Sequence, residues 1–116
     1  MRIEPFSDDL LAQAGELLAQ RHARDRAASP NLPPRFEATN QARTAVEATW
    51  QRPNTRGVAA LDGDRLLGYL MGDTTSDTLR GRHVWIRLAE HALAADQDPE
   101  LLRDLYAAAG QYWVER

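Results

Sequence analysis

Cysteine and lysine are both missing from this sequence of 116 residues, and each absence removes a class of chemistry. Without cysteine the chain has no disulfide, no thiolate nucleophile and no cysteine-ligated zinc site. All 14 basic residues are arginine, so lysine Schiff-base catalysis and the lysine of a phosphate-binding P-loop are excluded as well.

Long apolar runs and an excess of positive charge are missing too. No segment approaches the ~20 apolar residues of a membrane-spanning helix, and Met1–Pro5 lacks the apolar core of a signal peptide. Seventeen acidic residues against 14 basic ones give a formal charge of −3, which argues against a nucleic-acid-binding surface. We therefore expect a single cytoplasmic domain over residues 1–116, with neither a membrane nor a nucleic acid as partner.

The apolar residues that are present follow two periods. Helical spacing predicts helices over 8–28, 40–51 and 99–116, with Ser7 and Asp98 as N-caps of the first and third. Apolar runs predict strands at 2–6, 58–61, 66–71 and 83–88, the last extending toward Leu93. Asp62-Gly63 predicts a hairpin turn, and the polar stretch Gly72–Gly81 predicts a loop. This order predicts an α/β-layered (α+β) fold: an antiparallel sheet of about four strands with three helices.

Several polar and aromatic residues have a structural and a functional interpretation. His22 lies among three arginines, which could bind an acidic substrate, but a solvated helical face paired with Glu16 and Asp25 is favoured. The spacing of the three histidines (22, 83 and 91) matches no local ligand motif, so no metal site is expected. His83 is interpreted as a strand-edge residue. Five aromatic residues fit core positions by their period: Tyr69, Trp85, Tyr106, Tyr112 and Trp113.

The order of elements resembles the first half of a GNAT-superfamily N-acetyltransferase. An N-terminal strand leads into two helices around a proline-rich break at residues 29–34. The hairpin Gly57–Leu70 is similar to the family's second and third strands, with Gly68 where the family often has glycine. The resemblance implies transfer of an acyl group from acetyl-coenzyme A to an amine. It also implies a general base at Glu90, near the end of the fourth strand; the structural alternative is that Glu90 and His91 face solvent or a partner.

The stretch that should hold the cofactor departs from the family pattern. The family binds the pyrophosphate with an Arg/Gln-x-x-Gly-x-Gly/Ala loop between its fourth strand and third helix, where glycines expose backbone N–H groups. The corresponding stretch here, Ala94–Glu100, has no glycine and no arginine, carries three carboxylates, and includes Pro99, which lacks an N–H. We therefore expect that this chain alone does not bind acetyl-coenzyme A, and no residue is assigned to cofactor binding.

The resemblance and the departure at Ala94–Glu100 together suggest two functions. The first is a degenerate, non-catalytic N-terminal half of an acetyltransferase, because the family's fifth strand, fourth helix and last two strands are not in the sequence; a C-terminal catalytic domain would then be its partner. The alternative is a homodimerisation module that pairs the sheet edges at Val84–Leu93 and buries Trp85 and Ile86. An active enzyme assembled from two such chains ranks last, because dimerisation does not supply the missing glycines.

Overall fold

The computed structural model describes residues 1–32, 37–77, 81–86 and 88–114, and it confirms the α/β-layered fold. Strand β1 (Arg2–Pro5) and the short 3-10 helix η1 (Asp8–Leu10) lead into helices α1 (Leu11–Ala28) and α2 (Thr39–Trp50). Strands β2 (Thr55–Asp62), β3 (Arg65–Asp77) and β4 (Gly81–Trp85) follow, then η2 (Leu88–Glu90), β5 (His91–Leu93) and helix α3 (Glu100–Val114). Within these residues no helix combines the length and the apolar content needed to cross a membrane.

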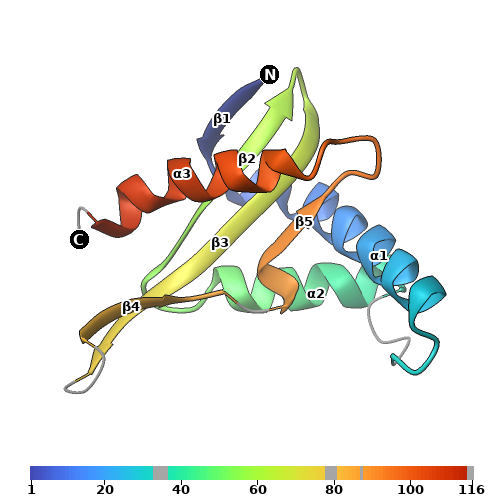
Figure 1. The fold of residues 1–116 in the computed structure, drawn as a ribbon, viewed down its shortest axis with the longest axis horizontal. Coiled ribbons are helices and arrows are strands. Elements are labelled where there is room, and N and C mark those ends of the chain that lie inside the picture. The colour runs from blue at the N-terminus through green and yellow to red at the C-terminus, as the bar shows by residue number, and fades with distance from the viewer. Residues whose placement is uncertain (33–36, 78–80, 87, 115–116) are drawn as a thin grey trace.

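The sheet is antiparallel, in the order β1-β2-β3-β4, and β5 also pairs with β3 (Figure 1). Strand β4 pairs with Asp73–Asp77, whereas β5 pairs with Gly68–Leu70. The predicted loop at Gly72–Gly81 is therefore wrong, because β3 continues to Asp77 and β4 begins at Gly81. The strand expected to run from residue 83 toward Leu93 is interrupted by η2.

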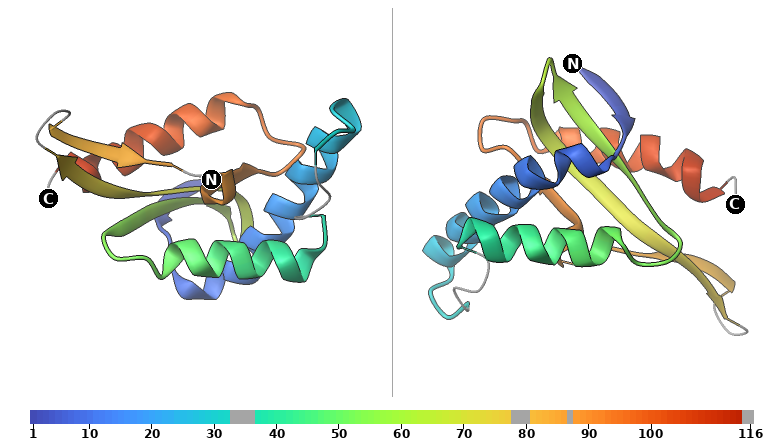
Figure 2. Two further views of the ribbon diagram at one scale, coloured as in Figure 1. Left: turned by 90° about the horizontal axis from the view of Figure 1, so that it is seen from below. Right: turned by 180° about the vertical axis from the view of Figure 1, so that it is seen from behind.

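Helices cover both faces of the sheet, α1 and α2 on one side and α3 on the other (Figure 2). Side chains alternate along a strand, so Ala59 and Leu61 of β2 pack toward α1 and α2. Val58 and Ala60 pack toward α3. The apolar run in β2 is continuous because both of its faces are buried.

The apolar face of α3 repeats every four residues along the helix. Leu101, Leu105, Ala109 and Trp113 are buried against the sheet. Tyr106 does not lie in the core as predicted: it is 45% exposed, because it flanks this narrow stripe.

The other predicted core aromatics have different outcomes. Tyr69 is fully buried, and its ring lies 5.9 Å from that of Phe6, which also meets Trp50 edge-to-face at 4.8 Å. The side chains of Trp85 and Tyr112, and that of His83, lie outside what the structure describes.

The two predicted N-caps behave differently. Asp98 caps α3 as predicted, because its Oδ1 accepts a 2.9 Å hydrogen bond from the Glu100 N–H. Ser7 has the extended backbone of an N-cap at η1, but its hydroxyl donates to the carboxylate of Asp9 and makes no side-chain bond to the helix backbone. The chain therefore enters α1 through a 3-10 turn, and α1 itself begins at Leu11.

Candidate functional site

The loop that connects β5 to α3 is the first candidate, because helix N-termini bind anions through free backbone N–H groups. The first N–H groups of α3 already have partners inside the chain. The Glu100 N–H donates to Asp98 Oδ1 and the Leu101 N–H to the Asp98 carbonyl, both at 2.9 Å. The Leu102 N–H donates to the Pro99 carbonyl at 3.1 Å, and Pro99 has no N–H. A carboxylate thus occupies the position that a phosphate would take at this helix end.

The same loop is tied to the hairpin by an ion pair. Arg65 Nη2 lies 2.8 Å from Asp96 Oδ1, and both side chains are more than half exposed. The hydrogen bond from Arg65 lowers the pKa of the Asp96 carboxyl, and the same contact raises the pKa of Arg65. Asp96 is therefore held in its charged form, and its carboxylate neutralises the positive charge of the Arg65 guanidinium next to this loop.

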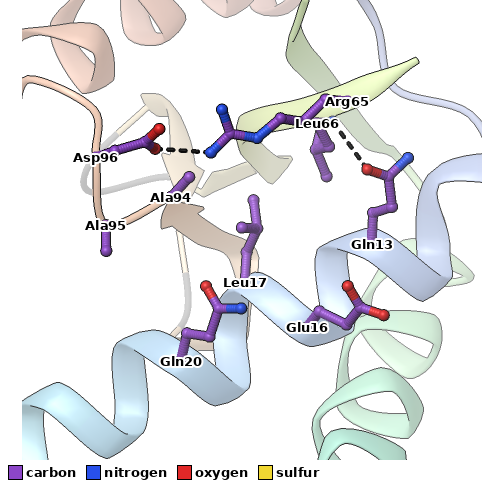
Figure 3. Close-up of a pocket in the computed structure, with 9 residues that line it drawn as sticks. All are labelled: Gln13, Glu16, Leu17, Gln20, Arg65, Leu66, Ala94, Ala95 and Asp96. Carbon is purple, nitrogen blue, oxygen red and sulfur yellow. Dashed lines mark hydrogen bonds and ion pairs between the residues drawn. The ribbon is translucent and has the colours of Figure 1, made fainter.

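A pocket of about 290 Å³ lies between α1, the start of β3 and this loop (Figure 3). Its floor is apolar, formed by Leu17, Leu66 and Ala94, all of which are buried. The Arg65–Asp96 pair spans one side, and exposed residues of α1 form the other, among them Glu16 and Gln20.

Gln13 fixes α1 to the hairpin at the end of this pocket. Its Oε1 accepts from the Leu66 N–H, and its Nε2 donates to the Asp64 carbonyl, each at 2.9 Å. The hairpin turn between β2 and β3 has Gly63 at a φ of 60°, a backbone conformation that glycine adopts without strain. These contacts set the position of Arg65, and therefore of the ion pair over the pocket.

Glu90, the residue that the resemblance implies as a general base, lies in η2 and is fully buried. The neighbouring Tyr69 hydroxyl donates to the Ala89 carbonyl at 2.8 Å. Burial raises the pKa of the Tyr69 hydroxyl, Arg21 opposes that shift, and Glu90 adds to it. Glu90 is thus placed among ionisable groups in the interior, and its role in catalysis remains a prediction.

Arg21 joins the same region from α1. Its Nη1 donates to the His91 carbonyl and lies 3.2 Å from His91 Nδ1, while its Nε lies 3.7 Å from Asp25 Oδ2. The predicted pairing of this arginine cluster with Asp25 is therefore present at Arg21. His22, in contrast, is not on a solvated face, because it is only 5% exposed.

Sequence reasoning missed the contacts that assemble these two regions. Arg65 and Asp96 are 31 residues apart, and Arg21 and His91 are 70 residues apart. No local motif connects residues at such separations. Among the described residues, no group of three or more histidine, aspartate or glutamate side chains could hold a metal ion.

Comparison with known proteins identifies the fold. The sequence matches no protein-family model and no curated protein. Among solved structures, a probable acetyltransferase matches 99% of this chain and 73% of its own, with 21% identity and a TM-score of 0.70. An acetyltransferase from Vibrio fischeri matches 99% of this chain and 88% of its own, with 12% identity and a TM-score of 0.66.

A third similar structure is a ribosomal-protein-alanine N-acetyltransferase from Brucella melitensis biovar Abortus 2308. It matches 100% of this chain and 74% of its own, with 14% identity and a TM-score of 0.60. Identities this low establish a shared architecture and leave the reaction open. The architecture of this chain is that of the GNAT-type acetyltransferases.

Proposed function

We propose that this chain is a non-catalytic GNAT-type domain of an N-acetyltransferase. In this proposal it contributes a scaffold or an interface, and a catalytic domain elsewhere holds the acyl donor. The similar acetyltransferases support the acyl-transfer context, and the occupied N-terminus of α3 supports the non-catalytic role.

The capped end of α3 carries this proposal. Acetyl-coenzyme A brings a pyrophosphate, which needs backbone N–H donors or cationic side chains. Here the N–H groups of Glu100, Leu101 and Leu102 are bonded within the chain, and Asp98 places a carboxylate among them. The nearby guanidinium of Arg65 is paired with Asp96. These residues do not fit the cofactor, so no catalytic step is assigned to this chain.

Calorimetric titration with acetyl-coenzyme A tests the proposal. We expect a dissociation constant weaker than about 1 mM, the regime in which the free energy of binding is less than about 4 kcal/mol in magnitude. A double variant, Asp98→Gly with Pro99→Gly, removes one carboxylate and restores one N–H, and we expect it to bind more tightly than the natural chain. A micromolar dissociation constant for the natural chain would contradict the proposal.

The homodimerisation module is the less supported of the two functions. Pairing of edge strands needs outward-facing backbone groups, and on β5 the carbonyls of His91 and Leu93 already accept hydrogen bonds from Arg21 and Arg24. We therefore expect light scattering of the purified chain to give the mass of a monomer near neutral pH. A stable dimer would favour the homodimerisation module instead.

A further inference from the structure

The outer edge of β5 has backbone groups that β3 does not use. The Ala94 N–H donates to the Leu67 carbonyl of β3 at 2.8 Å. Residues of an antiparallel strand alternate in direction, so Ala92 also faces β3, and His91 and Leu93 turn their carbonyls away from it. An edge of this kind would ordinarily be open to another chain.

Two arginines of α1 cover this edge. Arg21 Nη1 donates to the His91 carbonyl, and Arg24 Nη2 donates to the Leu93 carbonyl at 3.2 Å. The two arginines are three residues apart, which places them on the same face of the helix. The Arg21 side chain is only 13% exposed, so this contact is shielded from water far better than an ordinary surface interaction.

The Arg21 contact also depends on the protonation state of His91. Arg21 Nη1 lies 3.2 Å from His91 Nδ1, and a guanidinium only donates hydrogen bonds. His91 Nδ1 must therefore be the acceptor, which requires a neutral imidazole with its proton on Nε2. Protonation of His91 would put a hydrogen on Nδ1, so that two donors, the His91 Nδ1–H and the Arg21 N–H, would face each other. It would also bring two positive charges together.

The other ionisable groups around this contact come from three elements. Asp25 on α1 lies 3.7 Å from Arg21, Glu90 precedes His91 in the chain, and Tyr69 on β3 donates to Ala89. Burial and Arg21 both lower the pKa of His91, and Asp25 opposes them. The neutral imidazole is therefore the form that the folded chain favours.

We propose that Arg21 and His91 form a proton-sensitive latch on the outer edge of β5. The neutral imidazole holds the guanidinium against the strand, and the imidazolium releases it. Release leaves the His91 carbonyl without the hydrogen bond from Arg21. It also loosens β5, which is only three residues long and is paired with β3 on its other side. The latch is independent of whether the chain binds an acyl donor.

Nuclear magnetic resonance on the full chain tests the latch directly. From about pH 7.5 to about pH 5, we expect the separate Nη1 and Nη2 signals of Arg21 to merge as His91 becomes protonated. Over the same range, hydrogen-exchange protection of the Ala92 and Ala94 amides, corrected for intrinsic rates, should fall by roughly tenfold to hundredfold, as for the loss of one charge-assisted hydrogen bond. Both measurements use the natural chain, so they do not depend on the folding of a variant.

The variant His91→Asn sharpens the test, because its amide oxygen can accept from Arg21 in place of Nδ1 and does not titrate. We expect protection of β5 in this variant to stay constant with pH. The matched control His83→Asn should keep the pH dependence of the natural chain. The latch is overturned if His91 becomes protonated while the Arg21 signals and β5 protection stay unchanged, or if His91→Asn loses protection as the natural chain does.

Discussion

Gly15 allows α1 and α2 to approach each other closely. A Cβ atom added at Gly15 would lie 2.8 Å from the Cα of Arg43, a backbone atom of α2 that cannot move aside on its own. A Cβ atom added at a second helical glycine, Gly110 in α3, would meet no atom of the described residues within 4 Å apart from its own stretch of helix. The same substitution should therefore have opposite effects at the two sites.

We expect Gly15→Ala to lower the free energy of unfolding by about 1–3 kcal/mol, the range for overpacking a tight contact. Gly110→Ala should raise it by about 0.5–1 kcal/mol, because alanine favours the helix more than glycine does. Urea denaturation followed by circular dichroism measures both. A stabilised Gly15→Ala variant would mean that the two helices are not packed this closely.

Single residues were predicted from the sequence only where a local pattern reports burial. Tyr69 lies in an apolar run and is buried as predicted. The predicted apolar face of α3 included Tyr106, but the face that the helix buries is narrower and leaves Tyr106 exposed. Gly15 carries no local signal, because its significance comes from Arg43, which is distant in the sequence.

At the scale of elements, the start of α3 depends on one side chain. The Asp98 carboxylate accepts from the Glu100 N–H, and the helix N-terminus favours its negative charge. We expect Asp98→Ala to lower the free energy of unfolding by about 1 kcal/mol. Asp98→Asn keeps an acceptor and should cost only a few tenths. Chemical denaturation of the two variants separates loss of the cap from loss of charge, and equal effects would contradict the cap.

The elements that the sequence predicts best are those with turn chemistry and a buried face. The β2–β3 hairpin follows from Asp62-Gly63 and two apolar runs, and both strands are present. The far end of β3 was missed because Gly72–Asp77 is polar and reads as a loop. In the structure, Asp73–Asp77 of β3 pairs with β4. This end of the two strands projects beyond the helices (Figure 1), where no apolar face is needed.

At the scale of the whole molecule, the three-layer arrangement could be predicted from the order of elements, but the site could not. The glycine-free loop before α3 was visible in the sequence, and the structure adds the hydrogen bonds of Asp98 and the Arg65–Asp96 pair. Which helix residues meet the loop and β5 depends on how α1 crosses the sheet. That crossing is a property of tertiary packing and has no local pattern.

The stability of the whole chain should depend on pH through His91. Burial and Arg21 hold the pKa of His91 below its ordinary value of 6.5, so as the pH falls past 6.5 the unfolded chain takes up the proton first. This contribution to stability is therefore complete above 6.5 and declines as the pH falls below it. We expect a lower melting temperature at about pH 5 than at about pH 7.5, and a smaller difference in His91→Asn. Identical differences in both proteins would rule out His91 as the cause.

The separate pairing of β4 and β5 along β3 also has a consequence for how such a chain can change its length. In an uninterrupted strand, inserting one residue turns every later side chain to the opposite face of the sheet. Here β4 and β5 each have their own register on β3, at Asp73–Asp77 and at Gly68–Leu70. We therefore expect the connection between them to absorb a one-residue insertion or deletion, so that Ala92 keeps its place in the core.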